Sequence, residues 1–114
     1  MVDPAIYNIT IHQGATFELA LQYKDASGVP INMSGYTVAA QLWNRTGTSK
    51  LANFTSSWME QASGSFKIRL ASNVTSGITD QGQYDVMITE PNGDKSYLLQ
   101  GLATVDLGLT GKGL

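Results

Sequence analysis

The fold class is decided by the stretch Phe17-Glu18-Leu19-Ala20-Leu21-Gln22-Tyr23-Lys24, in which large apolar side chains occupy every second position. In an extended strand this alternation places Phe17, Leu19, Leu21 and Tyr23 on one face and the intervening residues on the other. An amphipathic helix would instead repeat its apolar positions every three to four residues. The stretch therefore predicts a β-strand with one buried face.

The same period of two recurs at residues 7–11, 37–42, 66–70 and 84–89, and a last strand is expected from about Ser96 to Leu107. Turn residues interrupt the pattern about every ten positions, which is typical of an antiparallel sandwich. Gly101, inside the last strand, indicates a bulge or a close backbone contact. The other side chains expected to face the core are Tyr7, Ile9, Ile11, Val38, Ala40, Leu42, Phe66, Ile68, Leu70, Tyr84, Val86, Ile88, Leu99 and Val105.

Two clusters of turn residues, at 25–30 and 90–94, are expected to reverse the chain, so that the strands before and after each cluster are neighbours. The second contains Asn92-Gly93, which accepts positive φ and favours a hairpin. Residues 72–78 are too few and too rich in hydroxyl groups for a stable helix. They predict a single helical turn that crosses between two sheets.

These patterns predict one all-β domain over residues 1–114, an antiparallel sandwich of seven or eight strands with its core at about residues 5–107. Residues 1–4 and 108–114 are expected to be flexible arms that order on assembly. The arm residues expected to make contacts are Val2, Asp3, Pro4, Leu109, Lys112 and Leu114.

Composition narrows the classes of partner. The formal charge is −2, and Lys and Arg are scattered, so neither nucleic acid nor an anionic membrane is expected as a partner. The absence of cysteine excludes disulfides and thiolate metal sites. The first residues do not resemble a basic, apolar signal peptide, so the product is expected to stay where it is made.

Catalytic chemistry is not expected. His12 is the one histidine, and we expect it to be a solvated or turn residue, because no nucleophile or paired carboxylate accompanies it. Asp80 and Asp94 are expected to serve turns, with a calcium site between loops as the weaker alternative. No enzyme activity and no cofactor are predicted. We also expect no glycan at the Asn-x-Ser/Thr triplets that begin at Asn8, Asn32, Asn44, Asn53 and Asn73.

Three aromatic residues are candidates for a functional surface. Trp43, Trp58 and Tyr36 could together form a platform on which a sugar ring stacks, as in a carbohydrate-binding module. Packing in the core or at a subunit interface is the favoured alternative, because large aromatic side chains are enriched at interfaces.

Motif order adds a resemblance. The segments at 7–17, 23–25, 28–36, 81–86 and 98–101, including Gln13-Gly14 and Gln81-Gly82-Gln83-Tyr84, follow one another with a characteristic spacing. With them the chain resembles, over about residues 5–107, the small immunoglobulin-like β-sandwich modules of tailed-phage virions, such as the N-terminal domain of upper baseplate proteins and short cyanophage structural proteins. At 32–34 it has Asn-Met-Ser where the usual form has Asp-Leu-Thr. In physical terms, Gly14, Gly35 and Gly82 would supply turns or positive φ, and Tyr84 would anchor a strand that follows a crossing turn.

The resemblance implies a non-enzymatic virion protein that packs in symmetric copies and joins other virion proteins, as an adaptor in the tail, baseplate or neck. A capsid decoration protein is the alternative within the virion. A carbohydrate-binding module that aids adsorption to the host is an alternative of another class.

Overall fold

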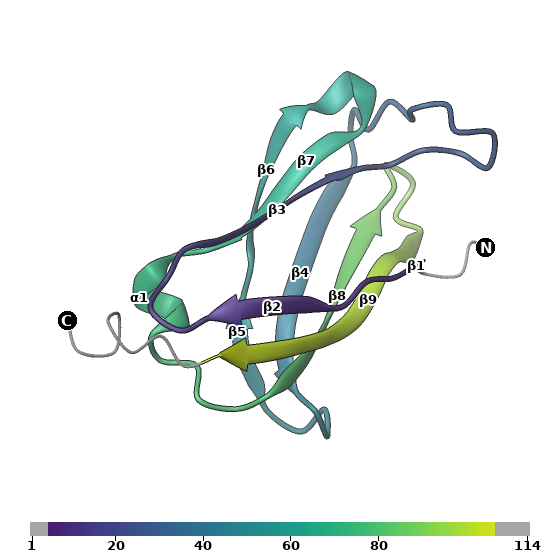
Figure 1. Cartoon of the computed structure of the whole chain (residues 1–114). Helices are drawn as coiled ribbons and strands as arrows, with labels where there is room; N and C mark the ends of the chain where they lie inside the picture. The colour runs from purple at the N-terminus through teal and green to yellow at the C-terminus, as the bar shows by residue number, and fades with distance from the viewer. Residues whose placement is uncertain (1–4, 107–114) are drawn as a thin grey trace.

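The computed structural model describes residues 5–106 (Figure 1). The expected arm residues Val2, Asp3, Pro4, Leu109, Lys112 and Leu114, and the expected strand end at Leu107, lie outside the described residues. The strands are β1 (Ala5–Ile6), β2 (Ile9–His12), β3 (Phe17–Gln22), β4 (Thr37–Asn44), β5 (Lys50–Asn53), β6 (Thr55–Glu60), β7 (Ser65–Leu70), β8 (Gly82–Thr89) and β9 (Lys95–Asp106), with a 3-10 turn η1 (Gln61–Ser63) and a helical turn α1 (Ser72–Thr75).

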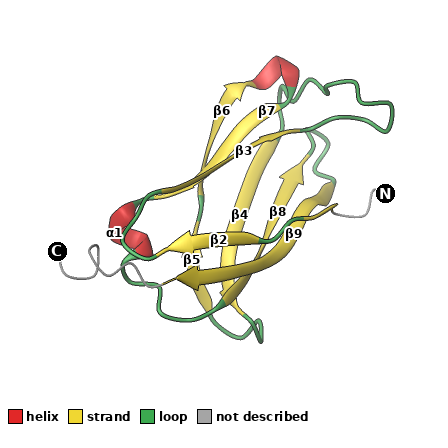
Figure 2. Cartoon of the chain, in the orientation of Figure 1, coloured by secondary structure: helices red, strands yellow, loops and turns green. Residues whose placement is uncertain are grey.

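The strands form two sheets that pack face to face as a sandwich (Figure 2). One sheet has the order β1-β9-β8-β4-β5, with β2 also on β9, and the other has the order β3-β7-β6. Because β1 and β2 both lie along β9, they act as one interrupted strand, and the predicted sandwich of seven or eight strands is confirmed. The division matches an immunoglobulin-like sandwich, with β3, β7 and β6 as strands B, E and D, and β4, β8 and β9 as C, F and G.

The pairing of β1 and β2 with β9 is parallel, whereas the other ladders are antiparallel. One detail of the predicted pairing is wrong. The strands on either side of the 25–30 cluster are not neighbours, since β3 pairs with β7 and β4 pairs with β8 and β5. The cluster does reverse the chain locally, through the bridge between Lys24 and Pro30. The chain then crosses to the other sheet.

The second cluster makes the predicted hairpin between β8 and β9. Gly93 N–H donates to the Glu90 carbonyl over 2.9 Å, and Gly93 takes the positive φ of +95°. The crossing turn is also confirmed, because α1 joins β7 of one sheet to β8 of the other.

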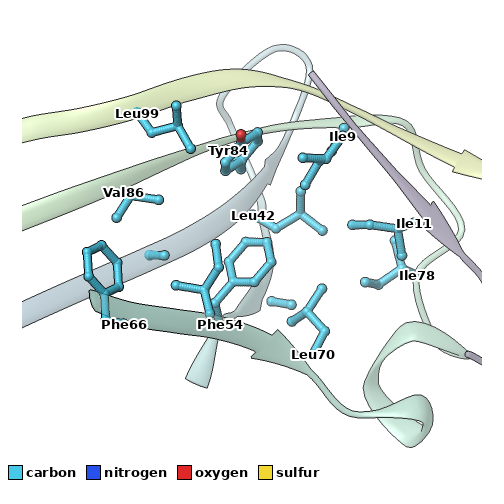
Figure 3. Packing of buried hydrophobic residues seen from close by; sticks show 14 of the residues in the cluster. Ile9, Ile11, Leu42, Phe54, Phe66, Leu70, Ile78, Tyr84, Val86 and Leu99 are labelled. Carbon is cyan, nitrogen blue, oxygen red and sulfur yellow. The ribbon is translucent and has the colours of Figure 1, made fainter. Parts of the chain in front are cut away.

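The core lies between the sheets and consists of the predicted alternating side chains, with additions from loops and the corner (Figure 3). In β8 every second residue is buried, including Tyr84, Val86 and Ile88, and β7 repeats the pattern. In β3 the inward side chains are only partly buried. Residues that carry no alternating signal complete the core, notably Met33, Phe54 and Ile78.

Tyr7 is an exception to the predicted core face, because its side chain is 52% exposed while Ile9 and Ile11 are buried. The cause is the break between β1 and β2, where the Tyr7 backbone passes over Gly101. A Cβ on Gly101 would lie 2.1 Å from the Tyr7 carbonyl oxygen, so the predicted close contact at Gly101 is real. The bulge in the β8–β9 ladder lies elsewhere, opposite Val86 and Met87.

Of the three glycines named with the resemblance, two have the predicted positive φ and one does not. Gly14 and Gly35 have φ of +85° and +81°, as predicted for turns. Gly82 does not have positive φ, because it is the first residue of β8 and pairs with Asn44. It is required for close approach instead, since a Cβ there would lie 2.6 Å from the Trp43 carbonyl oxygen.

Candidate functional site

The three candidate aromatic residues lie at two separate places. Tyr36 and Trp58 line one cleft, whereas Trp43 lines a hollow on the outer face of the larger sheet. The structure therefore brings two of the three together, and a single platform does not form. Each place has its own geometry and its own chemistry.

The first place, the edge cleft, arises where β5 leaves the larger sheet. The β4–β5 ladder covers only residues 41–43 of β4, and the Phe54 N–H then donates to the Ala40 carbonyl over 3.0 Å. After Phe54 the chain continues as β6 of the other sheet. The first half of β4 is thus left without a strand on this side, and a cleft of about 270 Å³ opens, lined by Tyr36, Thr37, Val38, Ser56, Ser57, Trp58 and Phe66.

Backbone polarity gives the edge cleft a means of pairing. Because the Ala40 carbonyl points toward β5, alternation along the strand turns the N–H and carbonyl of Val38 to the same side. The Ser56 hydroxyl donates to the Val38 carbonyl over 3.2 Å and so substitutes for a strand partner at one atom. An extended chain entering the cleft would meet these backbone groups.

Aromatic and hydroxyl-bearing side chains line the edge cleft together. Trp58 is 38% exposed and packs edge-on against Phe66, with ring centroids 6.1 Å apart, and the next residue, Met59, is 59% exposed. Tyr36 donates from its phenol to Glu90 Oε1 over 3.3 Å. Burial, and then the charge of Glu90, raises the pKa of the Tyr36 phenol, so the phenol remains a neutral donor at ordinary pH.

The second place, the sheet hollow, has a volume of about 650 Å³ and lies across β4, β8, β9 and β1. One row of paired residues runs Trp43, Gln83, Leu102, and the next runs Gln41, Asp85, Gln100, Ile6. The lining residues are Ile6, Asn8, Trp43, Gly47, Gln83, Tyr84, Asp85, Gln100, Gly101 and Leu102.

Hydrogen bonds fix part of the lining of the sheet hollow. The Trp43 indole N–H donates to Gln41 Oε1 over 3.0 Å. The Gln83 side-chain NH₂ lies 3.3 Å from each of two carbonyl oxygens of the β4–β5 turn, and Asn8 Oδ1 accepts from the Leu102 N–H over 3.0 Å. The indole ring and the two amides are therefore oriented before any ligand arrives.

Asp85 is the charged residue in this lining. Desolvation raises the pKa of its carboxyl above the ordinary value of 3.8. None of the ion pairs between residues 5 and 106 includes Asp85. A partly desolvated carboxylate without a cationic partner can accept hydrogen bonds from a ligand.

Potential metal ligands do not cluster in the described part of the chain. Over residues 5–106 there is no group of three or more His, Cys, Asp or Glu side chains placed to hold a metal ion. His12 is exposed at the end of β2, and its Nδ1 lies 4.0 Å from Asp106 Oδ2.

Over residues 5–106, no helix is long and apolar enough to cross a membrane.

The Asn-x-Ser/Thr triplets begin at surface positions, four of them exposed and Asn44 partly buried. Two of these asparagines shape turns, since Asn32 Oδ1 accepts from the Ser34 N–H and Asn44 Oδ1 accepts from the Thr48 N–H, each over 2.9 Å. Asp94 likewise belongs to the β8–β9 turn, where its N–H donates to Asn92 Oδ1.

Comparison with protein families gives a match that covers most of the chain. The family described as "LtfC-like, beta-sandwich domain" matches residues 3–105. The chain belongs to this family. Membership in the LtfC-like family agrees with the sandwich seen here and is consistent with a phage-associated β-sandwich module. A search of curated proteins finds no match.

Trp43 is the one lining residue of the LtfC-like domain's sheet hollow that the sequence singled out as a site residue; the polar lining residues Asn8, Gln83, Asp85 and Gln100 were not. In the sequence they occupy outward positions on strands or, for Asn8, the break between two strands, and an isolated strand does not indicate which outward residues lie next to one another. Their grouping can be predicted only when the β4–β8–β9 register is known.

Proposed function

We propose that this domain is a non-enzymatic structural component of a tailed-phage virion, a small adaptor in the tail, baseplate or neck that joins other virion proteins. Its membership in the LtfC-like family supports a phage setting. The observation that carries the adaptor role is the edge cleft, where the sheet edge at β4 is open and the aromatic side chains of Tyr36, Trp58 and Phe66 flank it.

The expected mode of contact is addition of an extended segment of a partner protein. Main-chain hydrogen bonds to the open edge would give affinity, and pockets for alternate side chains would give specificity. Val38 offers the backbone groups, while Trp58 and Tyr36 provide walls for an apolar side chain of the partner. Met59, the residue after Trp58, is a further exposed apolar side chain, at 59%.

The surface composition suits a permanent contact. Charged residues make up only 14% of the sequence, and permanent interfaces are depleted in charge because desolvation of ions is costly. Trp and Met are among the residue types enriched at interfaces. Trp58 and Met59 are therefore the residues expected to anchor the partner.

Photo-crosslinking in intact particles tests this role. A photoreactive phenylalanine analogue replaces Met59 in one variant and Val29 in a control, because the two side chains are similarly exposed, at 59% and 56%, and Val29 lies in the turn after β3. We expect position 59 to crosslink to a different virion protein and position 29 to give no such product. Absence of the chain from purified particles, or equal crosslinking at both positions, would contradict the proposal.

Electron cryomicroscopy of labelled particles tests the location. Density in the tail, baseplate or neck is the expected result. Density at the symmetry axes of the head would replace the adaptor by the capsid decoration protein, which is the alternative virion role.

A further inference from the structure

We propose that the sheet hollow is a binding site for an uncharged saccharide, which stacks on Trp43 and hydrogen-bonds to Asp85 and the surrounding side-chain amides. The site is separate from the edge cleft, and the inference does not rest on the virion role. Of the three aromatic candidates, only Trp43 belongs to it.

Shape is the first argument. The hollow of about 650 Å³ is within the usual range for small-ligand sites. It spans four strands, from β4 to β1, which at 4.7–4.9 Å per strand spacing is roughly 14 Å. One side is walled by the β4–β5 turn at Gly47 and the other by Ile6 of β1. The hollow is long enough for more than one sugar ring.

The chemistry of the lining is the second argument. Trp43 and Leu102 provide apolar surface, and the indole is fixed by its bond to Gln41. A pyranose with equatorial hydroxyls exposes axial C–H groups on its faces, which pack on an aromatic ring, while its hydroxyls lie around the rim. The lining therefore has the mixed character that such a ring requires.

The hydrogen-bonding capacity of the hollow matches hydroxyl groups, which both donate and accept. Asp85 provides acceptor oxygens without an ion-pair partner among residues 5–106. Since the Gln83 NH₂ group and Asn8 Oδ1 are held by backbone groups, Gln83 Oε1 remains as an acceptor and Asn8 Nδ2 as a donor. Gln100 adds a further amide. Hydroxyl groups can satisfy all of these groups together.

Charge selects the class of saccharide. The charged side chain in the lining is the Asp85 carboxylate, which repels a carboxylate or sulfate on a sugar. Desolvation has already raised the pKa of Asp85, so a second negative charge beside it would be more costly. The site therefore favours a neutral sugar over a uronic acid.

The test is a titration of the full chain with cellotriose, monitored by the chemical shifts of ¹⁵N NMR spectra. We expect the Trp43 indole signal and the side-chain amides of Gln83 and Gln100 to shift, while the Trp58 indole signal stays in place as an internal control. Sugar at about 10 mM would fill roughly 90% of a site with a Kd of about 1 mM. Trigalacturonate, the anionic counterpart, is expected to bind at least about tenfold more weakly.

Variants separate the site from its surroundings. Trp43→Ala and Asp85→Ala are each expected to weaken cellotriose binding by about tenfold or more. Gln100→Ala, at an exposed position, is a third variant, and we expect it to weaken cellotriose binding with little effect on folding. Tyr97→Ala serves as the matched control, since Tyr97 is an exposed aromatic residue on β9, the strand that carries Gln100, and does not line the hollow.

Three results would overturn the proposal. The first is the absence of shifts with cellotriose and also with triacetylchitotriose, a second neutral sugar. The second is binding that Trp43→Ala and Gln100→Ala leave unchanged, and the third is a set of shifts confined to Trp58. Tighter binding of trigalacturonate than of cellotriose would refute the assignment to uncharged sugars. The adaptor role would be untouched by any of these results, because it is tested in intact particles at Met59.

Discussion

The passage of the first strand over Gly101 leads to a prediction about stability. An added Cβ at Gly101 would lie 2.1 Å from the Tyr7 carbonyl oxygen and 2.7 Å from its carbon, about 1 Å short of any contact that a real Cβ makes. Both atoms belong to the backbone, so a side-chain rotation cannot relieve the clash. The variant Gly101→Ala must therefore displace the chain between β1 and β2.

The magnitude follows from what Tyr7 holds in place. Its N–H donates to the Gln100 carbonyl over 2.9 Å, and its carbonyl accepts the Tyr84 hydroxyl over 2.5 Å. Loss of two hydrogen bonds costs about 2 kcal/mol, and an orphaned buried hydroxyl adds to this. The substitution recovers about 0.4–1 kcal/mol by restricting the unfolded chain. The net loss expected for Gly101→Ala is about 2–4 kcal/mol in the free energy of unfolding.

Urea denaturation followed by circular dichroism measures this loss. With a slope of about 1–3 kcal/mol/M, the midpoint should fall by roughly 1–2 M. The control is Gly77→Ala, where the added Cβ would have an ordinary 3.6 Å contact and φ is not positive. The control should change stability by no more than about 1 kcal/mol. If the two variants have equal midpoints, the close passage over Gly101 does not constrain the fold.

Three further substitutions test individual side chains. Burial raises the pKa of Tyr84 from 10.0 to about 12, so the native state holds the phenol proton more tightly than the unfolded state. The free energy of unfolding of the wild type should therefore fall by about 2–3 kcal/mol as the pH rises from about 10 to about 12. Tyr84→Phe should show no such alkaline loss, and equal pH profiles would contradict the reasoning. Because desolvation raises the pKa of Asp85, its ionised form destabilises the native state above that pKa, and Asp85→Asn should raise the melting temperature more at about pH 7 than at about pH 3. A gain that is the same at both pH values would refute this. The buried Thr75 hydroxyl connects α1 to the β2–β3 loop through two hydrogen bonds of 2.8 and 3.1 Å. In chemical denaturation, Thr75→Val should therefore lower the free energy of unfolding by about 2–3 kcal/mol. The control Ser76→Ala, which removes an exposed hydroxyl, should leave the free energy of unfolding nearly unchanged.

Alternation predicted the strands that keep one face in the core along their whole length, such as β7 and β8. It missed β5 and β6, where the chain changes sheets at Phe54. Burial does alternate there, since Ala52 and Phe54 are buried, Ser56 is partly buried and the residues between them are exposed. Ala52 and Ser56 are small, however, so the sequence shows no run of large apolar residues at every second position. Alternation therefore did not predict β6, the strand that carries Ser56, Ser57 and Trp58 of the edge cleft.

Two glutamines in the motifs that carry the resemblance have structural roles that alternation does not explain. Gln81 clamps β9 beyond the end of the ladder, with its side chain accepting from the Val105 N–H and donating to the Val105 carbonyl, both over 2.9 Å. Gln13 is buried and donates to the Ile78 carbonyl over 3.1 Å. Each joins segments distant in sequence, so its role requires the tertiary structure to be known.

The corner at Phe54 also explains why the two proposed surfaces are independent. Because β5 pairs with only the second half of β4, the first half of β4 stays open as the edge cleft. The β4–β5 turn, at the other end of β4, lines the sheet hollow through Gly47. Trp43 and Val38 lie on one strand but point in different directions, one outward from the sheet and the other inward beside its open edge. A ligand in the hollow therefore leaves the backbone groups of the edge cleft accessible. A domain fixed by its edge to a neighbour would still present the hollow on the outer face of its larger sheet.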